Sequence, residues 1–182
     1  MKKVGIAGVG GIGSNVSLHL VRSGIKCFKI VDFDEIIETN LNRQFYFRDQ
    51  IGQRKVDKLE ENLKRINPDL MIEKEIKLLT SENIVETFAD CDIIIEGFDK
   101  ADCKSFLIDR FCKSGKIVIS ACGVAGMDAD AVKVKKVSDS VFIVGDFKTD
   151  IRNKKLFSHK VSAAASLMAG IALKKMGFTD EK

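Results

Sequence analysis

The stretch Val4-Gly5-Ile6-Ala7-Gly8-Val9-Gly10-Gly11-Ile12-Gly13 decides the fold. It runs from an apolar segment of strand length, 3–7, through the pattern G-x-G-x-x-G into 11–23, where apolar residues recur at helical spacing. Glycines in this pattern permit a tight strand-to-helix turn and let a phosphate approach the backbone closely. The N-terminus of the helix then offers free N–H groups to an anion. The stretch therefore predicts the first strand, turn and helix of a nucleotide-binding βαβ unit.

An acidic residue completes this unit. Asp32 follows a second apolar segment, 26–31, and lies 24 residues after Gly8, where a carboxylate accepts hydrogen bonds from ribose hydroxyls. The alternative is that the glycines serve only the turn, in a domain that binds no nucleotide. A P-loop is excluded, because Ser14-Asn15 stands where that motif requires Lys followed by Ser or Thr.

Segments of strand length and of helix length alternate along the rest of the chain, which is the pattern of parallel βαβ units. Further strands are predicted at 70–76, 92–96 and 116–120, and helices at 53–66, 81–88 (with Thr80 as its N-cap) and 101–113. The triplet Ile93-Ile94-Ile95 is typical of a central strand covered on both faces. Residues 32–51 show no periodicity and predict a long functional loop.

The pattern changes after Gly123. Residues 131–137 and 141–144 predict a short antiparallel extension at the edge of the sheet, and 159–176 a final apolar helix that ends at Gly177. We expect a Rossmann-like, doubly wound α/β fold with a mostly parallel sheet, forming a single nucleotide-binding domain over residues 1–182.

The composition excludes several other classes of protein. The 182 residues are 45% apolar and include a single Pro, no apolar run long enough to span a membrane and no signal peptide pattern. Five Cys without a close pair fit reduced thiols, so a cytoplasmic location without membrane association is expected. The net charge of +4 is spread along the chain, and there is no Trp and one Tyr, so nucleic acid is not an expected partner.

Four polar residues suit the phosphates of a nucleotide. Asn40 and Arg43 lie in the predicted loop, and Lys55 follows it. Arg offers a planar pair of donors and Lys a movable point charge. Asp99 follows the strand at 92–96, at the edge where open α/β sheets bind ligands, and a carboxylate beside phosphates suits Mg²⁺. Taken singly, the cations fit solvated charges equally well and Asp99 fits a helix N-cap, but together the four predict one phosphate site.

These motifs resemble those of the ThiF/MoeB family, the ubiquitin-activating-enzyme-like adenylyltransferases. The resemblance rests on the segments 8–13, 31–34, 40–44, 52–55, 98–99 and 120–126. The compact form, with Val144-Gly145-Asp146 late in the chain, is most similar to the ThiF-type adenylyltransferases that activate the sulfur carrier protein ThiS in thiamine biosynthesis.

The resemblance implies a reaction and the residues that perform it. ATP binds with Mg²⁺, and the C-terminal Gly carboxylate of a small ubiquitin-like, ThiS-like carrier is activated as an acyl-adenylate. Arg43, Lys55 and Asp99 are the implied catalytic residues, with Asp99 as the Mg²⁺ ligand. The implied nucleotide-binding residues are Gly8, Gly10, Gly11, Gly13, Asp32, Thr39, Asn40, Leu41, Asn42, Arg43, Lys55, Asp99 and Lys100. The resemblance also implies a homodimer, with the final helix contributing to its interface.

The sequence departs from the family pattern at several points. Paired Cys-x-x-Cys motifs are absent, so no structural zinc is expected, and no Cys matches the sulfur-transfer Cys of longer members. Cys122 is the nearest candidate, and its setting favours a small packing residue. Only Met1 and Lys2 precede the first strand, where many members carry an arginine that reaches the partner subunit's ATP. Lys100 replaces the usual Asn after Asp99, and either compensates for that arginine or lies on the surface.

Two alternatives to an active adenylyltransferase therefore remain open. One is an ATP-binding partner subunit of the same family that is catalytically incomplete alone. The other, less favoured, is a small NAD-binding oxidoreductase, for which the sequence offers only His19 and His159 as catalytic histidines.

Overall fold

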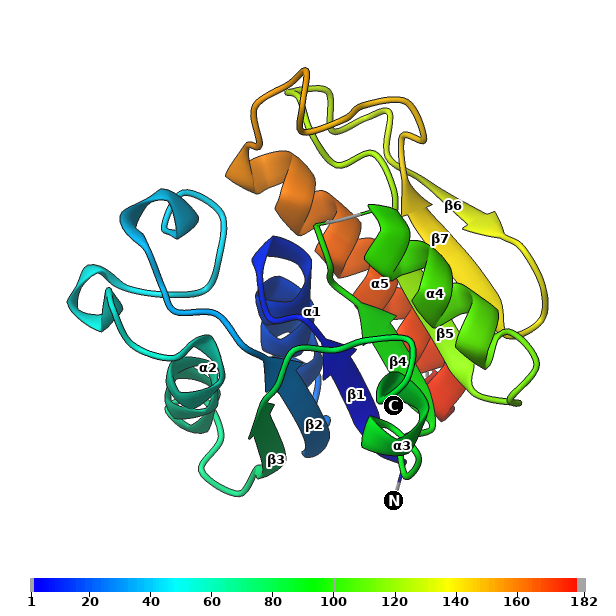
Figure 1. Cartoon of the computed structure of the whole chain (residues 1–182), viewed down its shortest axis with the longest axis horizontal. Coiled ribbons are helices and arrows are strands. Elements are labelled where there is room, and N and C mark those ends of the chain that lie inside the picture. The colour runs from blue at the N-terminus through cyan, green and yellow to red at the C-terminus, as the bar shows by residue number, and fades with distance from the viewer. Residues whose placement is uncertain (1, 100, 180–182) are drawn as a thin grey trace.

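The computed structural model describes residues 2–99 and 101–179, and within them seven strands form one sheet in the order β3-β2-β1-β4-β5-β7-β6 (Figure 1). The strands are β1 Val4–Ala7, β2 Cys27–Asp32, β3 Met71–Ile76, β4 Ile93–Glu96, β5 Ile117–Ala121, β6 Lys133–Lys136 and β7 Val141–Gly145. Every neighbouring pair is parallel except β6 and β7. The order reverses between β1 and β4, as in a Rossmann-like doubly wound fold, so the predicted fold class is confirmed.

Helices cover both faces of the sheet. They are α1 Gly11–Arg22, α2 Lys55–Lys64, α3 Ile84–Thr87, α4 Ala101–Phe111 and α5 Ser158–Met176, with 3₁₀ turns η1 Glu38–Asn40 and η2 Arg48–Gln50 in the predicted loop. One core cluster joins α1, α2 and α5 to the sheet, and a second joins α3 and α4 to its other face. Ile93 and Ile95 belong to the first cluster and Ile94 to the second, so β4 is covered on both faces as predicted.

One prediction of secondary structure was wrong in detail. The helix predicted at 81–88 with Thr80 as its N-cap is only α3, whose N-cap is Asn83. Residues 81–83 form a turn instead, in which Thr80 Oγ1 accepts the N–H of Glu82 at 3.3 Å and the N–H of Thr80 donates to Asn83 Oδ1 at 2.9 Å. The predicted antiparallel extension at the edge of the sheet is confirmed, and it consists of β6 paired with β7. The chain passes from β5 to β6 first and returns as β7, which then pairs in parallel with β5.

The loops that follow β1, β2 and β4 meet at one edge of the sheet, in the upper part of Figure 1. This is the carboxyl end of the parallel strands, where ligands bind in open α/β sheets. Among the described helices, none combines the length and the apolar character needed to cross a bilayer.

Candidate functional site

The glycines after β1 divide into two groups with different roles. Gly8 has φ of +87°, and a Cβ on Gly13 would lie 2.0 Å from the Gly8 carbonyl oxygen. A Cβ on Gly97, which follows β4, would lie 2.5 Å from the same oxygen. The turn after β1, the start of α1 and the end of β4 therefore meet backbone to backbone. Gly8, Gly13 and Gly97 are required by packing, whatever binds above them.

Gly10 and Gly11 belong to the second group. The nearest atom to a Cβ on Gly10 would be Gln44 Nε2, at 3.8 Å, so packing does not require glycine there. A Cβ on Gly11 would lie 3.3 Å from Val161 Cγ1. Gly10 is the N-cap of α1 and brings no side-chain cap, so the N–H groups of the first turn face outward without a capping oxygen. This end of α1 is open to an anion, as the sequence predicts.

Asp32, at the end of β2, is held by the backbone beside this turn. The N–H of Val9 donates to Oδ2 and the N–H of Asp34 donates to Oδ1, both at 2.8 Å. Burial raises the pKa of Asp32, and the positive charge of Lys55 acts against that rise. A carboxylate oxygen accepts more than one hydrogen bond, so both oxygens keep capacity for ribose hydroxyls.

Lys55 begins α2 and is buried, with its Nζ 2.7 Å from Asp34 Oδ2. Its ammonium therefore forms an ion pair with Asp34 and also acts on the charge of Asp32. The Tyr46 hydroxyl donates to the carbonyl oxygens of Val9, at 2.7 Å, and of Lys55, at 3.3 Å. This buried hydroxyl ties the start of α2 to the glycine turn.

Arg43 and Asp99 form the second charged group. The Arg43 side chain runs over the start of α1, since its Cγ would lie 3.6 Å from a Cβ on Gly11. Its Nη1 donates to Thr39 O at 2.9 Å and to Asn42 Oδ1 at 2.7 Å. Partial burial lowers the pKa of Arg43, and the negative charge of Asp99 acts in the opposite direction. The negative charge of Asp99 thus acts on the Arg43 guanidinium, whose side chain lies beside the open end of α1.

Two residues of the predicted phosphate loop have structural partners inside the protein. Asn40 is buried and its Oδ1 accepts a hydrogen bond from the N–H of Ile37 at 3.1 Å, which closes η1. Leu41 packs against the core. Lys100, also predicted to contact the nucleotide, lies outside the described residues.

Sequence reasoning missed three residues beside the start of α1, two of which bind the loop to this helix. Ser14 Oγ donates to Gly10 O at 2.6 Å and accepts the N–H of Phe45 at 3.1 Å. Asn15 Nδ2 donates to Gly11 O at 2.6 Å and to Arg43 O at 2.8 Å. The Ser14-Asn15 pair excluded a P-loop from the sequence, but nothing local predicted these long-range bonds.

Gln44 is the third residue. Its Oε1 is buried and has no hydrogen-bond partner among the described residues, while its Nε2 is the group nearest to Gly10. Buried polar atoms are normally satisfied, so the unpaired amide oxygen of Gln44 fits a bound ligand that donates a hydrogen bond. Gln44 ends the Asn40–Gln44 segment, which was the available signal.

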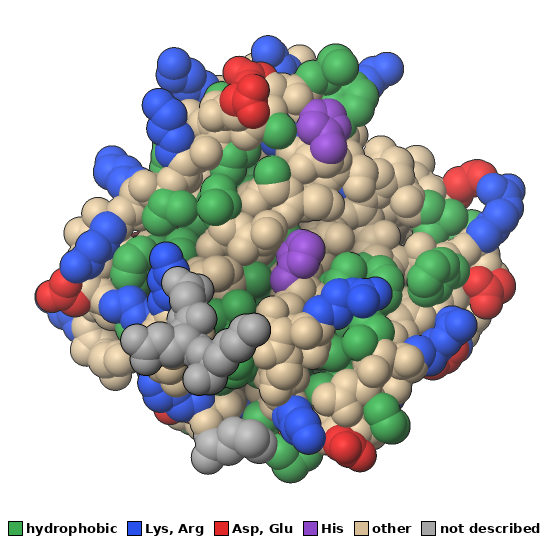
Figure 2. All heavy atoms as spheres, turned by 180° about the vertical axis from the view of Figure 1, so that it is seen from behind, with side chains coloured by type: hydrophobic (Ala, Val, Ile, Leu, Met, Phe, Trp, Pro, Cys, Tyr) green, Lys and Arg blue, Asp and Glu red, His purple; other side chains and the backbone are tan. Residues whose placement is uncertain are grey.

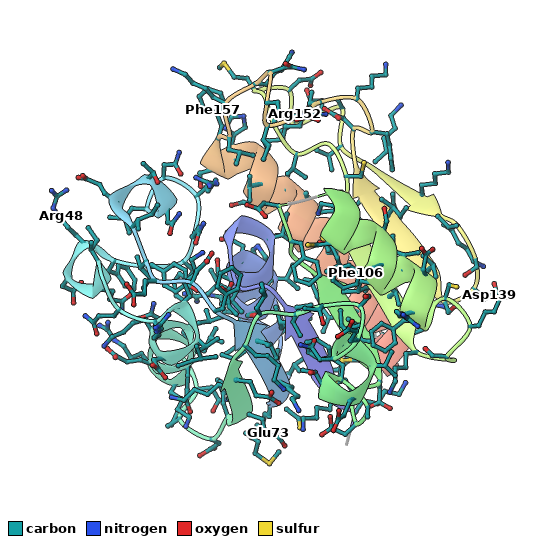
Figure 3. The ribbon with its side chains drawn as sticks, in the orientation of Figure 1. Arg48, Glu73, Phe106, Asp139, Arg152 and Phe157 are labelled. Carbon is teal, nitrogen blue, oxygen red and sulfur yellow. The ribbon has the colours of Figure 1, made fainter. Side chains whose placement is uncertain are left out.

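A cavity of about 700 Å³ lies between this loop and the segment before α5. Its walls are Thr39, Asn42 and Arg43 on one side and Ile151, Lys154, Lys155, Leu156, Phe157, Ser158 and His159 on the other. Figure 3 labels Phe157 on this segment, above the start of α5. The sequence did not predict the second wall. Of the four side chains predicted to converge on phosphates, Arg43 lines this cavity. Asn40 is bonded within η1, Lys55 joins Asp34, and Asp99 acts on Arg43 from outside the lining.

Over residues 2–99 and 101–179, no three His, Cys, Asp or Glu side chains gather in a way that would hold a metal ion. The expectation that Cys122 is a packing residue was wrong, because its side chain is exposed. Its backbone bonds to Val144 and Phe147 just beyond β5, which leaves the thiol on the surface.

Residues 1–180 match the family model described as the ThiF family. The tRNA threonylcarbamoyladenosine dehydratase of Bacillus subtilis is 34% identical over 125 residues, which cover 67% of this chain and 49% of that protein. The adenylyltransferase and sulfurtransferase UBA4 of Candida glabrata is 33% identical over 123 residues, covering 67% of this chain and 28% of that protein. The chain spans about half the length of the curated dehydratases it matches.

The E. coli tRNA N6-threonylcarbamoyladenosine dehydratase, solved in complex with ATP, superposes with a TM-score of 0.87 at 21% identity. The match covers 96% of this chain and 85% of that one. At this level of identity the likeness shows a shared fold.

Proposed function

Because the chain belongs to the ThiF family, we propose that it binds ATP and transfers the adenylyl group to a carboxylate of an acceptor molecule. The observation that carries the proposal is the open N-terminus of α1 at Gly10 and Gly11, flanked by Arg43 and within reach of the Asp99 charge. The adenylyltransferase name of one relative and the ATP complex of a fold neighbour support it.

Each part of the site has a role in this reaction. The ribose hydroxyls bind Asp32, whose orientation is fixed by two backbone N–H groups. The phosphates lie over the N–H groups at Gly10 and Gly11, and Arg43 offers them a planar donor pair. Lys55 reaches the phosphates by exchanging Asp34 for the ligand. The amide of Gln44 lies beside Gly10, where its Nε2 can donate to a phosphate oxygen, whereas its unpaired Oε1 accepts only from a donor such as a ribose hydroxyl.

The chemistry needs positioning rather than a base. An oxygen of the acceptor carboxylate, already ionised at neutral pH, forms a bond to the α-phosphorus. The bond from that phosphorus to the bridging oxygen breaks, and pyrophosphate leaves as the acyl-adenylate forms. Charge that develops on the phosphate oxygens is stabilised by Arg43, by Lys55 and by the N-terminus of α1.

The donor set also fits Mg²⁺. This ion usually takes one or two carboxylates and completes its shell with phosphate oxygens and water. Asp99, exposed at the end of β4, supplies one such carboxylate beside the phosphate position. A pre-formed cage of protein ligands is not required, in agreement with the charged groups that the structure describes.

For the acceptor we propose the C-terminal carboxylate of a small ubiquitin-like sulfur carrier of the ThiS type. Relatives named as ubiquitin-like modifier-activating enzymes and as UBA4 support this class. Relatives named as tRNA threonylcarbamoyladenosine dehydratases identify a second class, since the threonyl group of that nucleoside also carries a carboxylate.

We further propose that residues 1–182 act as one domain and that the protein is a homodimer. The single sheet supports the first point. The apolar side of α5 is used within the subunit, where it packs on α1 and the sheet, so it does not itself provide a dimer face. The rear face of the molecule carries scattered hydrophobic side chains between Lys and Arg (Figure 2).

Two measurements test the proposed function. Calorimetric titration with ATP and with NADH separates an adenylyltransferase from a dinucleotide-binding oxidoreductase, and we expect binding of ATP with weaker or no binding of NADH. ATP–pyrophosphate exchange is then measured with a ThiS-like carrier, with tRNA and with no acceptor, and we expect exchange only with the carrier.

The variants Asp99→Asn and Arg43→Gln are expected to abolish the exchange. Binding of ATP without exchange under any condition would instead indicate a catalytically incomplete partner subunit. Preferential binding of NADH would refute the proposal.

A further inference from the structure

A fully buried carboxylate lies at the end of β4, three residues before Asp99. Glu96 has no exposed surface. Its Oε1 accepts the backbone N–H of Phe98 at 2.6 Å, and its Oε2 accepts the hydroxyl of Ser120 at 2.6 Å. Lys104 Nζ, on α4, lies 3.0 Å from both oxygens. The roles proposed above leave this group without a function.

A buried ionised carboxylate is costly unless it is paired and fully hydrogen-bonded, and an apolar side chain would fill the same space without that cost. Glu96 therefore needs a reason beyond packing. Among the groups that donate to Glu96, the N–H of Phe98 is the informative one. By accepting this N–H, Glu96 fixes the peptide group of Phe98, and the next residue is Asp99. A carboxylate accepting a backbone N–H is a strong, directional contact.

Gly97 and Phe98, the two residues before Asp99, are both held in place. The N–H of Gly97 donates to Ala7 O at 2.9 Å, and Gly97 itself packs on the carbonyl of Gly8. The next N–H is held by Glu96, and the Phe98 ring packs against Phe106 of α4 with centroids 5.9 Å apart. Figure 3 labels Phe106 on this helix. The backbone is therefore fixed from the end of β4 to Phe98, the residue before Asp99.

The charge of Lys104 matters as much as its geometry. It neutralises Glu96, so that Asp99 is the carboxylate whose charge acts on Arg43 at the rim of the site. Without Lys104 a second negative charge would lie beneath the proposed phosphate position. Ser120, from β5, fixes the remaining oxygen of Glu96 and anchors the pair to the neighbouring strand.

We propose that Glu96, paired with Lys104, is a positioning residue for Asp99, and that the pair sets the affinity of the protein for Mg²⁺-bound ATP. The inference rests on the proposed function, in which Asp99 contacts Mg²⁺. Glu96 does not touch the nucleotide. It acts by fixing the Phe98 peptide, in the way that groups behind a metal ligand orient that ligand.

The test compares the dissociation constant of ATP in saturating Mg²⁺ with that in EDTA, measured by calorimetry on the full chain. We expect Glu96→Gln and Lys104→Met to weaken binding in Mg²⁺ by about 10-fold or more, as for other groups behind metal ligands, and to change binding in EDTA by less than about 2-fold. Lys104→Arg, which keeps the charge, is expected to retain most of the Mg²⁺ effect. The control is Lys3→Met, which removes a buried lysine paired with Asp90 at the opposite end of β1; it leaves both constants unchanged.

Ser120→Ala is a milder variant that keeps the inference testable if the Glu96 and Lys104 variants fail to fold. It removes one hydrogen bond to Glu96 and leaves the ion pair with Lys104 intact. It is expected to weaken binding in Mg²⁺ in the same direction by a smaller factor. Equal weakening in Mg²⁺ and EDTA, in Ser120→Ala or in either stronger variant that folds, would show a merely structural role and overturn the inference. So would unchanged binding in both.

Asp99→Asn separates this inference from the proposed function. If wild-type binding is indifferent to Mg²⁺, or if Asp99→Asn leaves the Mg²⁺ effect intact, the proposed role of Asp99 fails and the positioning role fails with it. If Asp99→Asn removes the Mg²⁺ effect and the Glu96 and Lys104 variants do not, the positioning role alone is wrong.

Discussion

Alanine at Gly13 and at Gly10 is expected to have opposite consequences, although both glycines belong to one motif. At Gly13 the new methyl carbon would lie 2.0 Å from the Gly8 carbonyl oxygen and 2.9 Å from Ile6 Cγ2. The oxygen would have to retreat by about 1.4 Å to reach the 3.4 Å at which ordinary contact begins. It belongs to a backbone that also packs on Gly97, so no flexible side chain can absorb the shift.

Overpacking of a core costs about 1–3 kcal/mol, and a clash between two backbones belongs at the upper end of that range. We therefore expect Gly13→Ala to lower the free energy of unfolding by about 3 kcal/mol. For a chain of this size that corresponds to a fall in Tm of about 6–12 °C.

Gly10→Ala is the matched variant. The nearest neighbouring atom to its methyl carbon is 3.8 Å away, so the clash that Gly13→Ala creates is absent. The change at the N-cap of α1 is expected to cost less than about 1 kcal/mol of stability. The methyl group, however, stands where the phosphates approach the first turn of α1, so the dissociation constant of ATP is expected to rise at least about 10-fold, or about 1.4 kcal/mol.

Urea unfolding followed by circular dichroism measures the first effect, and calorimetric titration with ATP measures the second. Wild-type stability in Gly13→Ala would refute the packing role of this glycine. Wild-type affinity in a folded Gly10→Ala would show that the nucleotide does not approach α1 here.

Two further predictions concern buried groups away from the proposed nucleotide. Lys160 and Asp146 form a buried ion pair, so Lys160→Met strands a carboxylate and is expected to cost about 3–5 kcal/mol of unfolding free energy in urea at pH 7. Burial acts to raise the pKa of Asp146, but hydrogen bonds from Lys160 and from the following loop hold that pKa well below its usual range. A lowered pKa stabilises the fold above the unfolded pKa of about 4, so the deficit of the variant should shrink as the pH falls below that value, and a constant deficit would contradict the pairing. Burial also raises the pKa of Cys91 to about 12, whereas Cys122 is exposed. A thiol reagent at pH 8 is therefore expected to modify Cys122 first and Cys91 only after unfolding, as peptide mapping by mass spectrometry will show; early modification of Cys91 would contradict its burial.

The sequence predicted the sheet well because each strand and helix carries its own periodic signal. The run at 93–95 and the glycine turn are local patterns, and local patterns determine local structure. Composition separates β6 from β7, because Val141–Gly145 is apolar and mostly buried whereas Lys133–Lys136 is Lys-rich and exposed, as expected of an edge strand. The parallel pairing of β7 with β5 was not predicted, because it depends on how the chain returns to the sheet.

The candidate site was predictable in its residues but not in their partners. Asp32 lies where the motif places it. Lys55 was expected among phosphates, yet its ammonium bonds Asp34, whose nearness follows from the course of the loop at 33–54. The cavity wall at 151–159 was not predicted for a related reason. Its residues show no motif, and they reach the site because α5 packs on α1.

The backbone contact among Gly8, Gly13 and Gly97 has a consequence for how this protein can be redesigned. These three positions form a fixed floor, because a change in one displaces the other two. The loop at 33–54, by contrast, is attached to α1 and to the glycine turn by exchangeable side-chain bonds, such as that of Asn15 to Arg43 O and that of Tyr46 to Val9 O. Libraries of variants aimed at a new nucleotide or acceptor should therefore vary the loop at 33–54 and keep Gly8, Gly13 and Gly97. Single loop residues can be substituted independently, whereas a substitution at one of these glycines displaces the backbone of the other two.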